Sequence, residues 1–186
     1  MTVLRGARLR LRQFRAEEFE IYWASTERWL DMSDPDADRQ AARERLRERV
    51  GASGEWTPNG IEFAIEHQGR LIGDIQARTN PMAMPPGVLE IGIELFEEAD
   101  RGQGLGTEAI ELFTAHLFDV REAHRVQLTT DLENAAMRAA AERLGFRYEG
   151  VMRSFMPSPN GPRDYAMYAM TLDDYRDVRS RRTRTS

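Results

Sequence analysis

Three glycines within five residues constrain this chain more than any other feature of its sequence. Gly102, Gly104 and Gly106 lie in the segment Arg101-Gly-Gln-Gly-Leu-Gly-Thr, between a predicted strand and a predicted helix. Glycine loses more backbone freedom on folding than any other residue, so this concentration indicates a turn that other residues could not form. Such a turn leaves N–H groups unpaired beside the positive end of the helix dipole. We therefore predict a phosphate or diphosphate site; a strand–helix connection without a ligand is the alternative.

The spacing of the glycines argues against a nicotinamide-binding domain. The dinucleotide fingerprint Gly-x-Gly-x-x-Gly follows a first parallel strand, and an acidic residue comes about 20 residues later. Here the third glycine comes one residue too early, and several predicted strands precede the turn. This is the weakest of the interpretations that we consider.

The composition excludes several kinds of catalysis. The 186 residues include no cysteine, and all 26 of the Lys and Arg residues are arginine. Thiolate nucleophiles, cysteine-ligated zinc, Schiff bases and the lysine of a P-loop are therefore impossible. The 3 histidines, at positions 67, 116 and 124, do not predict a metal site.

Charge and the terminal segments bear on partners and location. A net charge of -5 predicts no nucleic-acid partner, because such proteins usually carry a basic face. The chain has no run of 18 apolar residues and no signal-peptide core near Met1, so we expect a cytoplasmic protein without a membrane partner. We expect one domain over residues 1–178 and a disordered basic tail over 179–186.

Hydrophobic periodicity predicts alternating strands and helices. Period-two patterns predict strands near 8–13, 61–65, 71–75, 88–95, 125–130, 146–155 and 163–171. Helical spacing predicts helices near 16–30, 39–49 and 134–144, and a long helix from the glycine turn to about 120. Consecutive strands followed by strand–helix–strand units indicate a mixed sheet with helices on its faces.

Two motifs together resemble the GNAT acetyltransferase superfamily. Arg101-Gly-Gln-Gly-Leu-Gly matches the family's diphosphate loop, and the segment from Glu133-Asn-Ala-Ala-Met-Arg to Gly-Phe-Arg-Tyr-Glu-Gly resembles its second motif. The step Gly150-x-x-Arg153 and the later Arg163-Asp164 are most similar to the branch that includes ribosomal-protein N-terminal acetyltransferases. The resemblance implies a GNAT-like α/β (α+β) fold: a mixed, mostly antiparallel sheet of six to seven strands with helices on both faces.

The resemblance also implies acetyl-CoA as co-substrate and no metal. The diphosphate would lie on the loop residues Arg101, Gly102, Gln103, Gly104, Leu105, Gly106 and Thr107. The family's strand before this loop hydrogen-bonds the pantetheine arm through its backbone, which corresponds here to Ile93 and Leu95. Asn134 would contact the same arm, although an asparagine before a helix is also an ordinary N-cap.

Glu90 is our candidate for the catalytic base. Alternation along strand 88–95 places Val88, Glu90, Gly92 and Glu94 on the face opposite the core. An amine, with a pKa of about 7.7–10.4, must lose a proton before it attacks a thioester. Glu90 corresponds to a strand position that often carries an acid in the family; a solvated glutamate without a catalytic role is the alternative.

Two positions depart from the family's pattern. Many members carry a tyrosine in the second-motif helix that reprotonates the leaving thiolate, and this chain has Ala141 there. The ribosomal branch often has a serine where Met137 stands. The proton donor to CoA is therefore not identified: water, Tyr148, Tyr165 and Ser154 remain open.

The acceptor is expected to be an amine of unspecified identity. The family builds its acceptor cleft from the first two helices and the loop between them, here 31–38, where four aspartates could attract a cation or simply cap helices. We predict an N-acetyltransferase that acts by direct attack in a ternary complex on a protein N-terminus or a small-molecule amine. The family also implies that a homodimer can form. A catalytically silent acyl-CoA sensor is the competing function.

Overall fold

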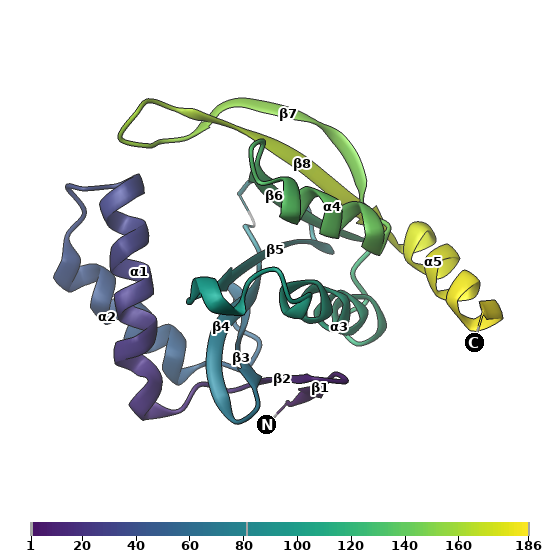
Figure 1. Ribbon diagram of the computed structural model, residues 1–186, viewed down its shortest axis with the longest axis horizontal. Helices are drawn as coiled ribbons and strands as arrows, with labels where there is room; N and C mark the ends of the chain where they lie inside the picture. Colours follow the sequence, from purple (N-terminus) through teal and green to yellow (C-terminus); the bar gives the residue numbers. More distant parts are fainter. Residues whose placement is uncertain (1, 81, 186) are drawn as a thin grey trace.

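The computed structural model describes residues 2–80 and 82–185, which form one eight-stranded sheet with helices on both faces (Figure 1). The strands are β1 (Leu4–Arg5), β2 (Leu9–Arg12), β3 (Gly60–His67), β4 (Arg70–Arg78), β5 (Val88–Leu95), β6 (Arg125–Asp131), β7 (Arg147–Met156) and β8 (Arg163–Thr171). The helices are α1 (Phe19–Ser33), α2 (Arg39–Gly51), α3 (Leu105–Asp119), α4 (Ala135–Leu144) and α5 (Leu172–Thr185), with short 3-10 turns at Ala16–Glu18 and Glu98–Asp100.

The sheet has the order β1-β2-β3-β4-β5-β6-β8-β7, and only β5 and β6 are parallel. The predicted mixed, mostly antiparallel sheet is therefore confirmed. The expected count of six to seven strands is one too low, because the two-residue β1 folds back on β2 and pairs Leu4 with Leu11. Two residues are too few to show an alternating pattern in the sequence.

The two halves of the sheet part between β5 and β6. These strands pair only from Val88 opposite Arg125 to Ile91 opposite Leu128. Farther along, β5 stays with β4 as far as Leu95, whereas β6 stays with β8 as far as Asp131. In Figure 1, β6, β7 and β8 consequently turn away from the half formed by β1 to β5.

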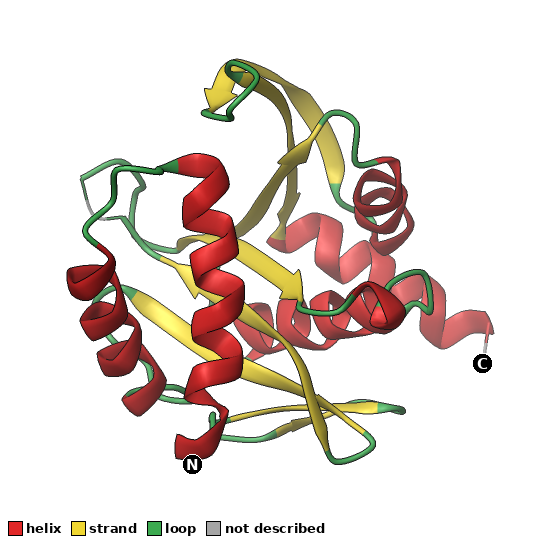
Figure 2. Cartoon of the chain, turned by 60° about the vertical axis from the view of Figure 1, so that its left-hand side comes forward, coloured by secondary structure: helices red, strands yellow, loops and turns green. Residues whose placement is uncertain are grey.

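Helices cover the sheet because its residues alternate between two apolar layers. Phe63, Ile65 and Ile75 belong to the larger core, which includes the buried side of α3. Ala64, between two of these residues, instead packs with Tyr22 and other residues of α1 and α2. Figure 2 shows α1 and α2 together on one side of the sheet.

The C-terminal segment differs from the tail that we expected over 179–186. Residues as far as Thr185 lie in α5, and Ser186 is outside the described residues. Arg179 pairs with Asp119 at 2.8 Å, and Tyr175 stacks on Phe118 with ring centroids 4.7 Å apart. An ion pair and an aromatic contact therefore hold α5 against the end of α3, although the segment has few apolar groups.

None of the helices within residues 2–80 and 82–185 is long and apolar enough to cross a bilayer.

Candidate active site

The glycine turn adopts the left-handed backbone that its composition predicts. Gly102 has φ 70° and Gly104 has φ 77°, a region that residues with a Cβ enter at a cost. A Cβ on Gly102 would meet nothing within 4 Å, so the backbone conformation, and not crowding, requires glycine there. Gly104 is the N-cap of α3 and supplies no capping side chain.

The head of α3 exposes unpaired backbone donors. The N–H of Glu108 donates to the carbonyl of Gly104 at 3.0 Å, which closes the first turn. The N–H groups of Leu105, Gly106 and Thr107 have no acceptor within the part of the chain that the structure describes. Three donors at the positive end of a 15-residue helix form an arrangement that binds anions.

The loop lies directly against the end of β5. A Cβ on Gly106 would lie 3.7 Å from Cδ1 of Leu95 and 3.9 Å from Cδ1 of Ile93. The structure therefore brings the predicted diphosphate residues and the predicted pantetheine residues together. β5 has already parted from β6 at this point, so the β6 side of its backbone is not paired with that strand.

The side chains of the loop stabilise the turn itself. Arg101 donates from Nη2 to the carbonyl of Leu95 at 3.0 Å, and Gln103 donates to the carbonyl of Ala99 at 2.6 Å. Leu95, whose backbone we expect to contact the pantetheine arm, thus accepts a bond from Arg101 at its carbonyl.

Asn134 is the N-cap of α4. Its Oδ1 accepts a hydrogen bond from the N–H of Met137 at 3.0 Å. The capping interpretation is therefore confirmed. The amide nitrogen of the same side chain makes no hydrogen bond within the described residues, so Asn134 can also donate to a ligand.

Glu90 is not a freely solvated side chain. It accepts a hydrogen bond from Arg78 at 2.7 Å and another from Gln127 at 3.1 Å, and its side chain is 21% exposed. Glu90 stands opposite Gln127, one pair before the last β5–β6 pair. It therefore lies close to the point where the two halves of the sheet part, held by two neighbouring strands.

Three acidic residues on the same face form a cluster that sequence analysis missed. Glu62, Asp74 and Glu94 come from β3, β4 and β5, and Asp74 pairs directly with Glu94. Glu94 accepts from Ser25 of α1 at 2.5 Å. Glu62 accepts from Arg49 of α2 at 2.6 Å and from the hydroxyl of Tyr22. In the sequence these acids alternate with apolar residues, as the residues of a solvent-facing strand face do. Only the positions of α1 and α2 show that this face is covered.

Burial makes the central acid of this cluster difficult to ionise. Asp74 is only 3% exposed. Desolvation raises its pKa well above the usual value, and the nearby Glu62 and Glu94 raise it further, while Arg49 opposes them. Burial likewise raises the pKa of Tyr22, to which the Asp74 and Glu62 charges add. Asp74 and Tyr22 therefore favour their protonated forms in this cluster.

A cavity of about 560 Å³ adjoins the cluster. It is bounded by α2, the segment after α2, β3 and β4, and its charged lining residues are Arg45, Glu48, Arg49, Glu55, Glu62 and Arg78. Two side chains of the lining, Gln76 and Arg78, also lie beside Gly92, where a Cβ would be 3.4 Å from Nε2 of Gln76. Gln76 and Arg78 thus lie between the cavity and Gly92, the first β5 residue beyond the β5–β6 pairing.

The aspartates of segment 31–38, of which Asp31 lies in the last turn of α1, are partly engaged in local structure. Asp38 caps α2 by accepting from Ala41 N–H at 3.0 Å, and Asp31 pairs with Arg39 at 2.7 Å. Capping is therefore confirmed for Asp38. No group of three His, Cys, Asp or Glu side chains in residues 2–80 and 82–185 is arranged to hold a metal ion.

Comparison with known proteins assigns this arrangement to a family. The model of the acetyltransferase (GNAT) domain matches residues 8–147, more than half of the chain. The chain belongs to the GNAT acetyltransferase family. Acetyl transfer from acetyl-CoA is thus the activity of this protein, which is an acyltransferase, as the two sequence motifs predicted.

Individual relatives agree with this assignment. The chain is 23% identical over 180 residues to the uncharacterized N-acetyltransferase p20 of Bacillus licheniformis, and the match covers 94% of this chain and 99% of p20. The RimL ribosomal L7/L12 alpha-N-protein acetyltransferase, solved with coenzyme A, matches the structure with a TM-score of 0.75 at 19% identity. The match covers 93% of this chain and 99% of RimL. RimJ of Mycobacterium smegmatis, solved with a CoA-disulfide, has a TM-score of 0.71 at 21% identity, covering 93% and 87%.

Proposed function

We propose that this GNAT protein transfers the acetyl group of acetyl-CoA to a primary amine, either a protein N-terminus or a small molecule. The observation that carries the proposal is the left-handed glycine turn, which leaves the N–H groups of Leu105, Gly106 and Thr107 unpaired at the head of α3. These donors lie beside the segment of β5 that has parted from β6. A diphosphate on the turn would therefore direct the pantetheine arm into the opening of the sheet.

Different residues would bind the diphosphate and the pantetheine arm of the cofactor. The backbone of Gly102, Gln103, Gly104, Leu105, Gly106 and Thr107 would hold the diphosphate, with Arg101 fixing the turn through Leu95. The backbone of Ile93 and Leu95 would hydrogen-bond the pantetheine arm. Asn134 would donate its free amide nitrogen to the same arm while it caps α4.

The reaction would proceed by direct attack. The neutral amine adds to the thioester carbonyl, and the C–S bond then breaks. The CoA thiolate leaves, and the acetyl group stays bonded to the amine nitrogen. The nitrogen loses one proton to a base, and the thiolate takes one from a donor that stays open among water, Tyr148, Tyr165 and Ser154. No cysteine is present to carry the acetyl group, which supports direct transfer in a ternary complex of protein, cofactor and amine.

Glu90 is the proposed base. It lies one residue pair from the opening between β5 and β6, and Arg78 and Gln127 fix the direction of its carboxylate. The cavity that Arg78 and Gln76 line would admit the amine on the same face. General-base assistance of this kind contributes about 10²–10⁴-fold to a rate.

The competing function is an acyl-CoA sensor, and one observation favours it. Ala141 is fully buried in the core and carries no hydroxyl, so this position supplies no proton donor to the leaving thiolate. Turnover distinguishes the two functions. The purified protein is mixed with acetyl-CoA and a panel of peptides with free N-termini, polyamines, aminoglycosides and amino acids, and released thiol is measured.

An enzyme releases CoA with at least one amine and leaves an acetylated product that mass spectrometry detects. A sensor is stabilised against heat by acetyl-CoA but releases no CoA with any amine in the panel. Peptides with free N-termini are tested first, because RimL, one of the structural relatives, is a ribosomal L7/L12 alpha-N-protein acetyltransferase.

A further inference from the structure

The turn between β1 and β2 brings a guanidinium to the side of the glycine loop. Arg8 donates from Nη1 to the carbonyl of Gln103 at 2.9 Å. Its Nε donates to Oε2 of Glu108, and its backbone N–H donates to Oε1 of the same carboxylate, both at 2.8 Å. Gln103 and Glu108 flank the N-terminus of α3, so Arg8 contacts both sides of the predicted diphosphate site.

One donor of Arg8 remains available. Its Nη2 has no partner within the described part of the chain, and a Cβ on Gly104 would lie 3.4 Å from that atom. The Arg8 side chain is 48% exposed. The free edge of the Arg8 guanidinium therefore borders Gly104, whose positive φ favours glycine.

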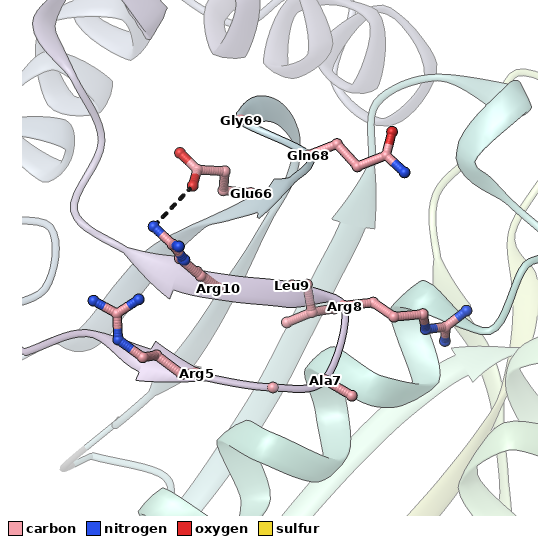
Figure 3. A pocket seen from close by; sticks show the side chains of 9 residues that line it. Arg5, Ala7, Arg8, Leu9, Arg10, Glu66, Gln68 and Gly69 are labelled. Carbon is pink, nitrogen blue, oxygen red and sulfur yellow. Dashed lines mark ion pairs between the residues drawn. The ribbon is translucent and has the colours of Figure 1, made fainter.

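The other arginines of the hairpin have different surroundings. Arg5, Arg8 and Arg10 all line a cavity of about 470 Å³ between this hairpin and the β3–β4 turn. Figure 3 shows the side chain of Arg8 directed away from those of Arg5 and Arg10. Arg10 instead approaches Glu66, at 3.9 Å. Arg8 is thus separated from its neighbours and belongs to the head of α3.

A diphosphate on this turn requires positive charge beyond the helix dipole. The dipole supplies about half a unit charge, whereas a diphosphate bridge carries about two negative charges. Arg101, the arginine of the loop itself, is directed to the Leu95 carbonyl. A guanidinium donates to phosphate oxygens through a planar fork of N–H groups, and Arg8 has such a group free beside Gly104.

We propose that Arg8 binds the diphosphate of acetyl-CoA through Nη2, while its Nη1 and Nε hold Gln103 and Glu108 in place. This inference rests on the proposed function. It adds a residue from the N-terminal hairpin, about a hundred positions before the glycine loop, to the cofactor site.

The test compares Arg8→Gln with Arg10→Gln in calorimetric titrations of the full-length protein with acetyl-CoA. We expect Arg8→Gln to weaken binding about tenfold, to raise the KM for acetyl-CoA by a similar factor and to leave kcat unchanged at saturation. Arg10→Gln changes the same charge in the same hairpin and should bind as the wild type does. Thermal unfolding of each variant verifies that it is folded.

Two further measurements separate a phosphate contact from a structural role. Dephospho-CoA keeps the diphosphate but lacks the ribose phosphate, so Arg8→Gln should weaken its binding by the same factor. Glu108→Gln removes the ion pair but keeps the guanidinium, and should change affinity less than threefold. Arg8→Lys restores the charge without the fork and should recover part of the loss.

The inference is overturned if Arg8→Gln binds acetyl-CoA with wild-type affinity, if dephospho-CoA is insensitive to it, or if Glu108→Gln costs as much as Arg8→Gln. In all three cases the wild type still binds acetyl-CoA and the proposed function stands. If the wild type itself does not bind acetyl-CoA, the proposed function fails.

Discussion

Alanine at Gly106 should stabilise the protein and weaken its binding of acetyl-CoA. Gly106 is the second residue of α3, and its φ lies outside the left-handed region. Alanine is favoured over glycine in a helix by about 0.5–1 kcal/mol. The new Cβ would make ordinary contacts with Leu95 at 3.7 Å and Ile93 at 3.9 Å. For a chain of this length, about 2–4 °C of melting temperature corresponds to 1 kcal/mol, so we expect a rise of about 1–4 °C.

The same methyl group would stand between the head of α3 and β5. If the diphosphate and pantetheine arm pass there, the methyl group narrows their path, and we expect at least a tenfold loss of acetyl-CoA affinity. Gly104→Ala is the matched variant. Its φ of 77° makes a Cβ cost about 1–2 kcal/mol, so this protein should melt about 2–8 °C lower. The Cβ would also stand 3.4 Å from Nη2 of Arg8, so we expect this variant to bind acetyl-CoA weakly as well.

The two variants therefore move stability in opposite directions and affinity in the same direction. Thermal unfolding without ligand gives the first quantity, and calorimetric titration gives the second. A Gly106→Ala protein that is stabilised and binds acetyl-CoA as tightly as the wild type would refute the placement of the cofactor between α3 and β5.

Three other substitutions test the remaining residues. Glu90→Gln should slow turnover most at low pH, where the free amine is scarcest, whereas Glu94→Gln should change the pH–rate profile little; a wild-type profile for Glu90→Gln would remove it as the base. Asn134→Ala should lower the free energy of unfolding by about 1 kcal/mol through loss of the cap, and in addition raise the KM for acetyl-CoA; an unchanged KM would leave only the cap. Asp74→Asn should flatten the pH dependence of stability. Because the native pKa of Asp74 is raised, the wild type loses stability as pH rises from the unfolded value near 3.8 through the native pKa. Thermal unfolding at several pH values measures this loss in both proteins. Equal pH dependence in the wild type and in Asp74→Asn would mean that Asp74 is ionised without cost.

The long periodic segments could be predicted because each carries its own signal. Strand β5 alternates clearly, and the glycine turn followed by an amphipathic run marks the start of α3. The two-residue β1 has no period of its own and exists only because β2 is beside it. The C-terminal segment is strongly charged, and its helix depends on contacts such as Arg179 with Asp119 that are sixty positions apart.

The candidate site shows the same division. The backbone of the glycine loop could be predicted, since glycine adopts the left-handed turn at Gly102 and Gly104 at the lowest cost. Arg8 and Asp74 could not, because their importance comes from distant neighbours: the head of α3 for Arg8, and α1 and α2 for Asp74. In the sequence both look like solvated charges on alternating strands.

A crystal structure with bound acetyl-CoA tests the central claim most directly. We expect the diphosphate on the N–H groups of Leu105, Gly106 and Thr107, and the pantetheine arm along β5 where it has left β6. A diphosphate bound elsewhere, or those N–H groups occupied by acceptors of the protein itself, would contradict the account.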